Sequence, residues 1–252
     1  TLSTSPATKA TTMFRRVFLT AILAGLLSGA VLSVVQEFTT TPLILFAEQF
    51  EDQVSIAKDG VQLAHGQVPV HPHDETGRAA WAPEDGIERM SFTALTNIIF
   101  GVGFALLLVG LFALHGGPKS GREGTVWGVA GFTVFALAPA LGLPAELPGS
   151  TAAALEARQI WWFFAAGGAG VGVALMVFAR NWWMPVVGIV ALALPHLVGA
   201  PHPEAYVSGP LPAELAGQFA ASSLVVQAIF WAVMGWTAGK VWSRMDDATE
   251  TA

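Results

Sequence analysis

Two short stretches combine histidines with carboxylates, the side chains that bind divalent transition metals. In HGQVPVHPHDE, residues 65–75, His71 and His73 are followed directly by Asp74. An H-x-H pair beside carboxylates can bind Co²⁺, Ni²⁺, Cu²⁺ or Zn²⁺ through nitrogen and oxygen ligands. The intervening proline keeps the backbone extended, so the two imidazoles need not face the same way. The pattern is equally typical of a solvated polar loop.

The second stretch, LPHLVGAPHPE at 194–204, places His196 and His202 before Glu204. Pro195 has no N–H to donate, so it frees carbonyl groups near the end of an apolar segment. Irregular backbone at membrane depth is tolerated mainly where it is buried in protein or lines a cavity. We therefore favour this stretch, with Glu146, as the mouth of a metal site, and His71, His73 and Asp74 as an accessory. The alternative is that His196 only caps the helix end.

A further set of polar residues follows or precedes apolar segments and is expected to line an entrance: Gln36, Glu37, Glu48 and Gln159. For Glu156 and Arg158, which lie close together in sequence, we expect a surface ion pair. No H-E-x-x-H motif, nucleophile–base pair or phosphate-binding loop occurs, so the sequence indicates neither an enzyme nor an ATPase.

The composition is that of a membrane protein. The chain has 252 residues, of which 53% are hydrophobic and 12% charged, whereas soluble domains carry about 25% charged residues. Cysteine is absent, so any metal must use histidine, carboxylate, carbonyl or water ligands.

Six apolar stretches are long enough to be transmembrane helices, which need roughly 20 residues. We therefore predict an all-α integral membrane protein with spans near 17–36, 92–114, 125–143, 159–179, 182–198 and 218–239. Only Arg180 and Asn181 separate the fourth and fifth spans, so these two helices are expected to form a tight hairpin. Residues 1–12 are expected to be a disordered or peripheral tail, 37–91 an outer polar loop, and 246–252 a second tail, around one transmembrane domain at 13–245.

The distribution of charge predicts the orientation. Lys and Arg favour the cytoplasmic side, and they are concentrated in the N-terminal region, in the segments around 119–122 and 180, and after 239. Both termini are therefore expected in the cytoplasm. The opposite face is acidic and carries every histidine except His115, which favours a divalent cation and excludes nucleic acid as a partner.

A faint internal repeat is present. LPAELPG at 143–149 recurs as LPAELAG at 211–217, and Gln159 and Gln227 follow the two glutamates at the same spacing. The third and fourth spans and the fifth and sixth thus resemble two related hairpins in parallel orientation. Chance recurrence in a biased sequence is the alternative.

Four blocks in order, MFRRVFLTAILAGLLSG (13–29), TPLILFAEQFE (41–51), LGLPAELPG with ALEARQIWW (141–162) and LPHLVGAPHPE (194–204), resemble the CbtA family. The resemblance covers 13 to about 242. It implies a small permease component of cobalt transport linked to cobalamin metabolism. It also implies a small single-span, His-rich companion protein of the CbtB type.

From these observations we expect a membrane component of a divalent-metal transport system, with Co²⁺, or else Ni²⁺ or Zn²⁺, as the transported ion and no certain cofactor. The alternative is a non-transporting scaffold or accessory subunit of a larger membrane complex. Few ionisable residues fall in mid-membrane, and glycine-rich faces suit packing against other helices. Both features favour that alternative.

Overall fold

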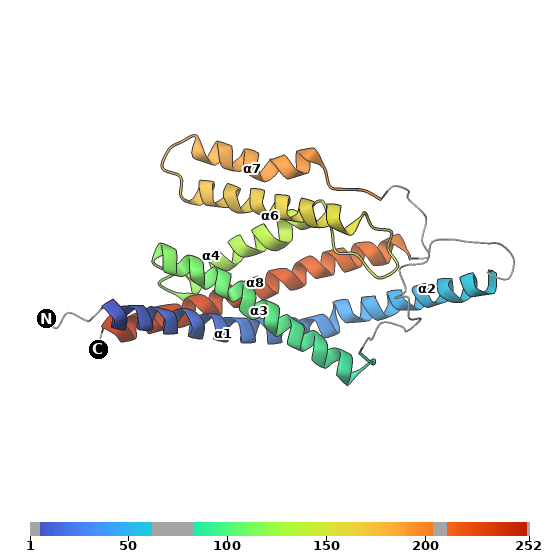
Figure 1. Cartoon of the computed structure of the whole chain (residues 1–252), viewed down its shortest axis with the longest axis horizontal. Coiled ribbons are helices and arrows are strands. Elements are labelled where there is room, and N and C mark those ends of the chain that lie inside the picture. Colours follow the sequence, from blue (N-terminus) through green and yellow to red (C-terminus); the bar gives the residue numbers. More distant parts are fainter. Residues whose placement is uncertain (1–5, 62–82, 204–210, 251–252) are drawn as a thin grey trace.

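The structure, a computed structural model, describes residues 6–61, 83–203 and 211–250 (Figure 1). All regular structure in these ranges is helical. In chain order it comprises α1 (Pro6–Phe38), α2 (Thr40–Val61), α3 (Ile87–His115), α4 (Gly121–Phe132), the π-helix η1 (Thr133–Leu137), α5 (Ala138–Ala140), α6 (Leu155–Val177), α7 (Met184–Val198) and α8 (Ala213–Glu250).

The predicted all-helical class is confirmed for the described residues, and their apolar helices are compatible with a membrane protein. Within the described residues, four helical segments are long and apolar enough to cross a bilayer: Thr11–Phe38, Ile87–His115, Leu155–Val177 and Ala213–Asp246. The predicted fifth span corresponds to α7, a shorter apolar helix. The predicted third span corresponds to α4, η1 and α5, which follow one another without a gap. Six membrane crossings therefore stay a prediction.

Helical structure extends beyond the predicted spans. Residues 6–12 belong to α1, which has a proline at its first helical position, where the missing N–H costs nothing. The last helix continues to Glu250. The segment expected to be a polar loop begins with α2, because Leu43, Ile44, Ala47 and Phe50 form an apolar stripe at helical spacing. That stripe packs in a small core cluster with Leu147, Leu215 and Phe219.

Helices α1 and α8 run side by side and form the base of the bundle (Figure 1). Helix α3 packs on α1, helix α4 packs on α8, and the pair α6–α7 joins the rest through η1 and α5. The start of α1 and the end of α8 lie together, because Arg16 forms an ion pair with Asp246, donates to the Trp242 carbonyl at 2.9 Å and lies 3.8 Å from the Trp242 ring centroid. We call this end of the bundle, which also carries Lys119 and Arg180, the basic end, and the opposite end, where α2 begins, the acidic end.

The pair α4–α8 is held by glycines on both helices. A Cβ atom at Gly124 would lie 2.6 Å from the Gly239 Cα, and one at Gly235 would lie 2.8 Å from the Gly128 Cα. Side chains larger than hydrogen are excluded because backbone faces backbone. This is the close approach that small residues permit between membrane helices, whose association depends on van der Waals packing.

The two other main helix pairs also pack closely through glycines. In α1–α3, a Cβ atom at Gly29 would lie 2.7 Å from the Ile98 Cα, and one at Gly101 would lie 2.6 Å from the Gly25 carbonyl oxygen. In α6–α7, a Cβ atom at Gly172 would lie 2.7 Å from the Gly188 carbonyl oxygen. The tight hairpin predicted for α6 and α7 is confirmed.

The two units of the sequence repeat do not pack as two separate hairpins. Helix α4 packs on α8 and helix α6 packs on α7, so the main packing partner of each helix belongs to the other unit of the repeat. The glycine matches decide this, because Gly124 and Gly128 face the glycines of α8. One equivalence survives in space: Leu147 and Leu215, at matching repeat positions, are both buried in the cluster with Ala47.

We expect the substitution Gly124→Ala to lower the free energy of unfolding by about 1–3 kcal/mol, because its Cβ would force α4 and α8 apart. Thermal unfolding in mild detergent, followed by tryptophan fluorescence, measures the effect. The matched control is Gly110→Ala on α3, where a Cβ would meet nothing within 4 Å. Equal melting temperatures for the two variants would contradict this account of the α4–α8 interface.

Candidate functional site

An acidic cavity of about 730 Å³ opens between the end of α1, the start of α2 and the start of α3. Its charged lining consists of Glu37, Glu48, Asp85 and Arg89. Hydroxyl and amide groups complete the polar lining: Thr40, Thr41, Thr93, Thr96, Gln36 and Asn97. Three of the four predicted entrance residues, Gln36, Glu37 and Glu48, therefore line one cavity.

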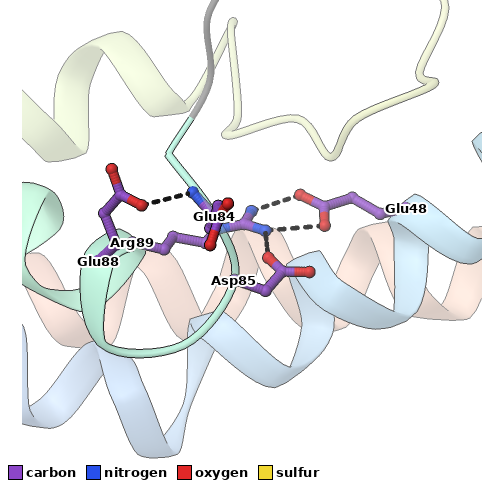
Figure 2. A network of polar contacts seen from close by, with 5 residues as sticks. All are labelled: Glu48, Glu84, Asp85, Glu88 and Arg89. Carbon is purple, nitrogen blue, oxygen red and sulfur yellow. Dashed lines mark hydrogen bonds and ion pairs between the residues drawn. The ribbon is translucent and has the colours of Figure 1, made fainter.

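Arg89 is surrounded by carboxylates (Figure 2). Its two terminal nitrogens donate to both oxygens of Glu48, with Nη1 at 2.9 Å from Oε2, and Nη1 also donates to Asp85 Oδ1 at 3.0 Å. The bidentate geometry ties α2 to α3 and is the strong form of a carboxylate pair. The guanidinium thus occupies the position that an added cation would take between Glu48 and Asp85.

A second, central cavity of about 360 Å³ lies deeper in the bundle, and all helices except α4 and α7 contribute to its walls. Its polar side chains are neutral: Gln36, Thr40, Ser223 and Gln227. Its aromatic walls are Phe104, Phe135, Trp162 and Trp231. The described residues that line it include no carboxylate and no imidazole.

The two cavities adjoin at Gln36 and Thr40, which line both. Asn97 Nδ2 donates to Gln36 Oε1 at 2.6 Å and to Ser33 Oγ at 3.1 Å, so the Gln36 amide is held by α3. Thr40 is 5% exposed. A continuous run of polar side chains therefore leads from the acidic end of the bundle into its centre.

Three packed aromatic rings close the central cavity on its basic side. The Phe104 ring centroid lies 5.3 Å from those of Phe135 and Trp231, and the Phe135 and Trp231 rings stack at 5.7 Å. Beyond them an apolar cavity of about 420 Å³, which the same three residues also line, extends to His115 near the basic end. The rings thus separate a polar space from an apolar one.

The π-helix η1 forms the wall of the central cavity at Phe135 and Ala136. The Ala138 N–H donates to the Thr133 carbonyl five residues back, and Pro139, next in the chain, has no N–H to donate. One carbonyl group in this turn therefore lacks its usual main-chain donor. Single π-helical turns occur frequently at functional sites.

The predicted histidine site lies elsewhere, between α6 and α7. The His196 ring packs edge-on against Trp161, with centroids 5.7 Å apart, and its buried Nε2 atom has no hydrogen-bond partner among the described residues. Pro195 frees the Ala191 carbonyl, as expected, but a Cβ atom at Gly168 would lie 2.6 Å from that oxygen. The freed carbonyl is thus packed against α6 rather than facing a cavity.

The other predicted ligands are dispersed. Glu146 forms an ion pair with Arg158 at 2.8 Å, so the expected pair of Arg158 with Glu156 is wrong. Gln159 is exposed and does not line either polar cavity, and His202 is exposed at the end of the α7 connection. His71, His73, Asp74 and Glu204 lie outside the described residues. Within the described ranges, no group of three histidine or carboxylate side chains is close enough to bind one metal ion.

Sequence reasoning missed Arg89, Asp85, Thr40 and Asn97 as cavity residues. Gln227 was noticed only through the repeat. A usable signal existed for Asn97, because an amide in the middle of an apolar helix requires a polar partner. For Arg89 the local signal is Asp85, four residues earlier, whereas its two hydrogen bonds to Glu48 depend on how α2 meets α3.

The all-helical architecture, the long apolar helices and the apolar exterior together are those of a membrane protein. The chain belongs to the CbtA family, because the model of that family, described as "Probable cobalt transporter subunit (CbtA)", matches residues 14–243. No match was found among curated proteins or among solved structures. The resemblance inferred from the four sequence blocks is confirmed.

Removing the Arg89 guanidinium should free Glu48 and Asp85 for an added cation. We expect Arg89→Gln to tighten Co²⁺ or Mn²⁺ binding by the purified protein about tenfold, because the internal competitor is lost. Isothermal titration calorimetry measures this. The double variant Arg89→Gln with Glu48→Gln should return to weak binding, and equal affinity of the wild type and Arg89→Gln would show that no cation binds between these carboxylates.

Proposed function

We infer that this chain is the membrane component of a divalent-metal transport system of the cobalt type, and that the ion enters through the acidic cavity. The observation that supports this most directly is the adjoining pair of cavities: a carboxylate-lined one at the acidic end and a neutral polar one behind it, meeting at Gln36 and Thr40. Family membership supplies the metal class.

The charge at the two ends supports one orientation. Lysines and arginines at the basic end, with Arg16, Lys119 and Arg180 among them, favour the cytoplasm. In this proposal the chain crosses a bacterial inner membrane six times, with α4–η1–α5 and α7 as the shorter crossings and both termini in the cytoplasm. The acidic cavity then faces outward.

The acidic cavity suits attraction and release better than permanent binding. Three carboxylates and one guanidinium leave a net negative lining, which raises the local concentration of divalent cations. Passage requires binding that is favourable enough to admit the ion and weak enough to release it. Carboxylates already paired with Arg89 meet that requirement, because an incoming ion must compete with the guanidinium.

The predicted histidine ligands enter this proposal as a capture surface near the same end. Two of them would first have to be freed, because the unpartnered Nε2 atom of His196 is buried and Glu146 is paired with Arg158. His202 and Glu204 follow α7, and His71, His73 and Asp74 belong to the segment between α2 and α3. In the proposal these residues deliver the ion and do not form a closed cage.

An accessory or scaffold subunit is the second candidate. Arg89 already neutralises Glu48, and the ring cluster of Phe104, Phe135 and Trp231 closes the central cavity towards the basic end. Both observations suit a chain that acts only with a partner, such as a small single-span His-rich protein of the CbtB type or a larger membrane complex. Exposed apolar residues on α6 and α7, such as Phe163 and Leu197, are available for lipid or a partner helix.

Uptake of radioactive Co²⁺ tests the leading proposal in bacterial cells that lack their own cobalt importer. We expect Glu37→Gln to reduce uptake at limiting Co²⁺ about tenfold, because a carboxylate beside Gln36 is lost from the acidic cavity. The matched control is Glu156→Gln, an exposed glutamate at the same end of the bundle that does not line the cavity.

The two candidates give different outcomes in that assay. Equal uptake by the wild type, Glu37→Gln and cells without the protein, together with a stoichiometric partner in the purified preparation, would favour the accessory subunit. Uptake that depends on Glu37 and not on Glu156 supports transport through the acidic cavity.

A further inference from the structure

Among the residues that line the central cavity, none has a side chain of the kind that replaces the water bound to a metal ion. Gln36, Thr40, Ser223 and Gln227 are neutral amides and alcohols. First-row divalent metals are retained in proteins mainly by imidazole, thiolate and carboxylate ligands. Neutral oxygens of this kind instead accept hydrogen bonds from water bound to the ion.

The size of the cavity suits a hydrated ion. Six water molecules need roughly 90 Å³ of space for their centres, at about 15 Å³ each. The central cavity offers about 360 Å³ on the same measure, well above that requirement. An octahedral hexaaqua ion therefore fits, with space for a few further waters.

The polar groups of the cavity are arranged to accept hydrogen bonds. Gln36 Oε1 accepts from Asn97 Nδ2, and this contact fixes the side chain while leaving one lone pair of the oxygen free. The Gln227 amide makes no hydrogen bond to the described part of the chain, so both its oxygen and its nitrogen are available to the cavity. Thr40 and Ser223 add hydroxyl groups to the same lining.

The aromatic walls are compatible with the same occupant. Trp162 and Trp231, together with Phe104 and Phe135, line the cavity with aromatic rings, whose π-systems attract cations. The stacked Phe135 and Trp231 rings also close the space towards the apolar cavity. A hydrated ion is therefore compatible with the walls of the central cavity, and the ring cluster of Phe104, Phe135 and Trp231 blocks its way to the apolar cavity.

We propose that the central cavity is a binding site for a fully hydrated divalent cation, recognised through its water shell by Gln36 and Gln227. This rests on the proposed function, which supplies the ion through the acidic cavity. The ion passes Gln36 and Thr40 with its six waters in place and waits above the ring cluster of Phe104, Phe135 and Trp231.

Hexaamminecobalt(III) is the probe, because its ammine ligands do not exchange and it can be bound only through its outer shell. The full chain in lipid nanodiscs is titrated, and quenching of tryptophan fluorescence is measured, since Trp162 and Trp231 line the cavity. Gln227 lines the central cavity and not the acidic one, so a change caused by its substitution reports on the central cavity alone.

We expect Gln227→Leu to weaken probe binding about tenfold. Gln227→Glu, which keeps the size and adds a charge, should tighten it. The matched control is Gln159→Leu, at the equivalent repeat position but exposed, and it should leave binding unchanged. Identical titration curves for the wild type, Gln227→Leu and Gln227→Glu would overturn the hydrated-ion site.

Co²⁺ uptake by the same variants separates this inference from the proposed function. If uptake depends on Glu37 while probe binding ignores Gln227, the transport proposal stands and the hydrated-ion site falls. If probe binding depends on Gln227 while uptake ignores Glu37, the site stands as a cation site and transport through the acidic cavity falls.

Discussion

The close approach of helix backbones at glycines is the constraint on which the rest of this molecule depends. Membrane helices gain little from hiding apolar side chains from one another in lipid, so their association depends on packing. At the α4–α8 interface, Gly124 and Gly128 lie against Gly235 and Gly239. The same interface positions the Trp231 ring at the end of the central cavity, because a Cβ atom at Gly131 would strike that ring.

The central cavity lies where this close packing is interrupted. The helix that begins at α4 changes to a π-helical turn and reaches Pro139, and the large ring of Trp231 holds the wall apart from α3. Glycine contacts on α4 and α8 are confined to the basic side of this point. The bundle is therefore tightly packed on its basic side, whereas the π-helical turn and Pro139 adjoin a polar cavity in its interior.

Electrostatics then distinguishes the two ends. Arg89 forms ion pairs with Glu48 and Asp85 at the acidic cavity, and Arg158 forms one with Glu146. Partly buried carboxylates such as Glu48 and Glu146 would be costly without these partners. Acidic residues can therefore line the entrance while the bundle remains stable, and the neutral groups behind them avoid holding a divalent ion too tightly.

Composition and the lengths of the apolar stretches predicted the all-helical class, the apolar helices and the α6–α7 hairpin, because burial in lipid requires long apolar segments. Four sequence blocks also indicated the family, and Gln36, Glu37 and Glu48 were expected at an entrance. The tertiary structure decided which residues meet. It packs α4 against α8, and it pairs Glu48 with Arg89 and Glu146 with Arg158. It also brings Gln36 and Gln227 to the walls of one cavity. These contacts join residues far apart in the chain, and they depend on glycine matches between helices that no local pattern specifies.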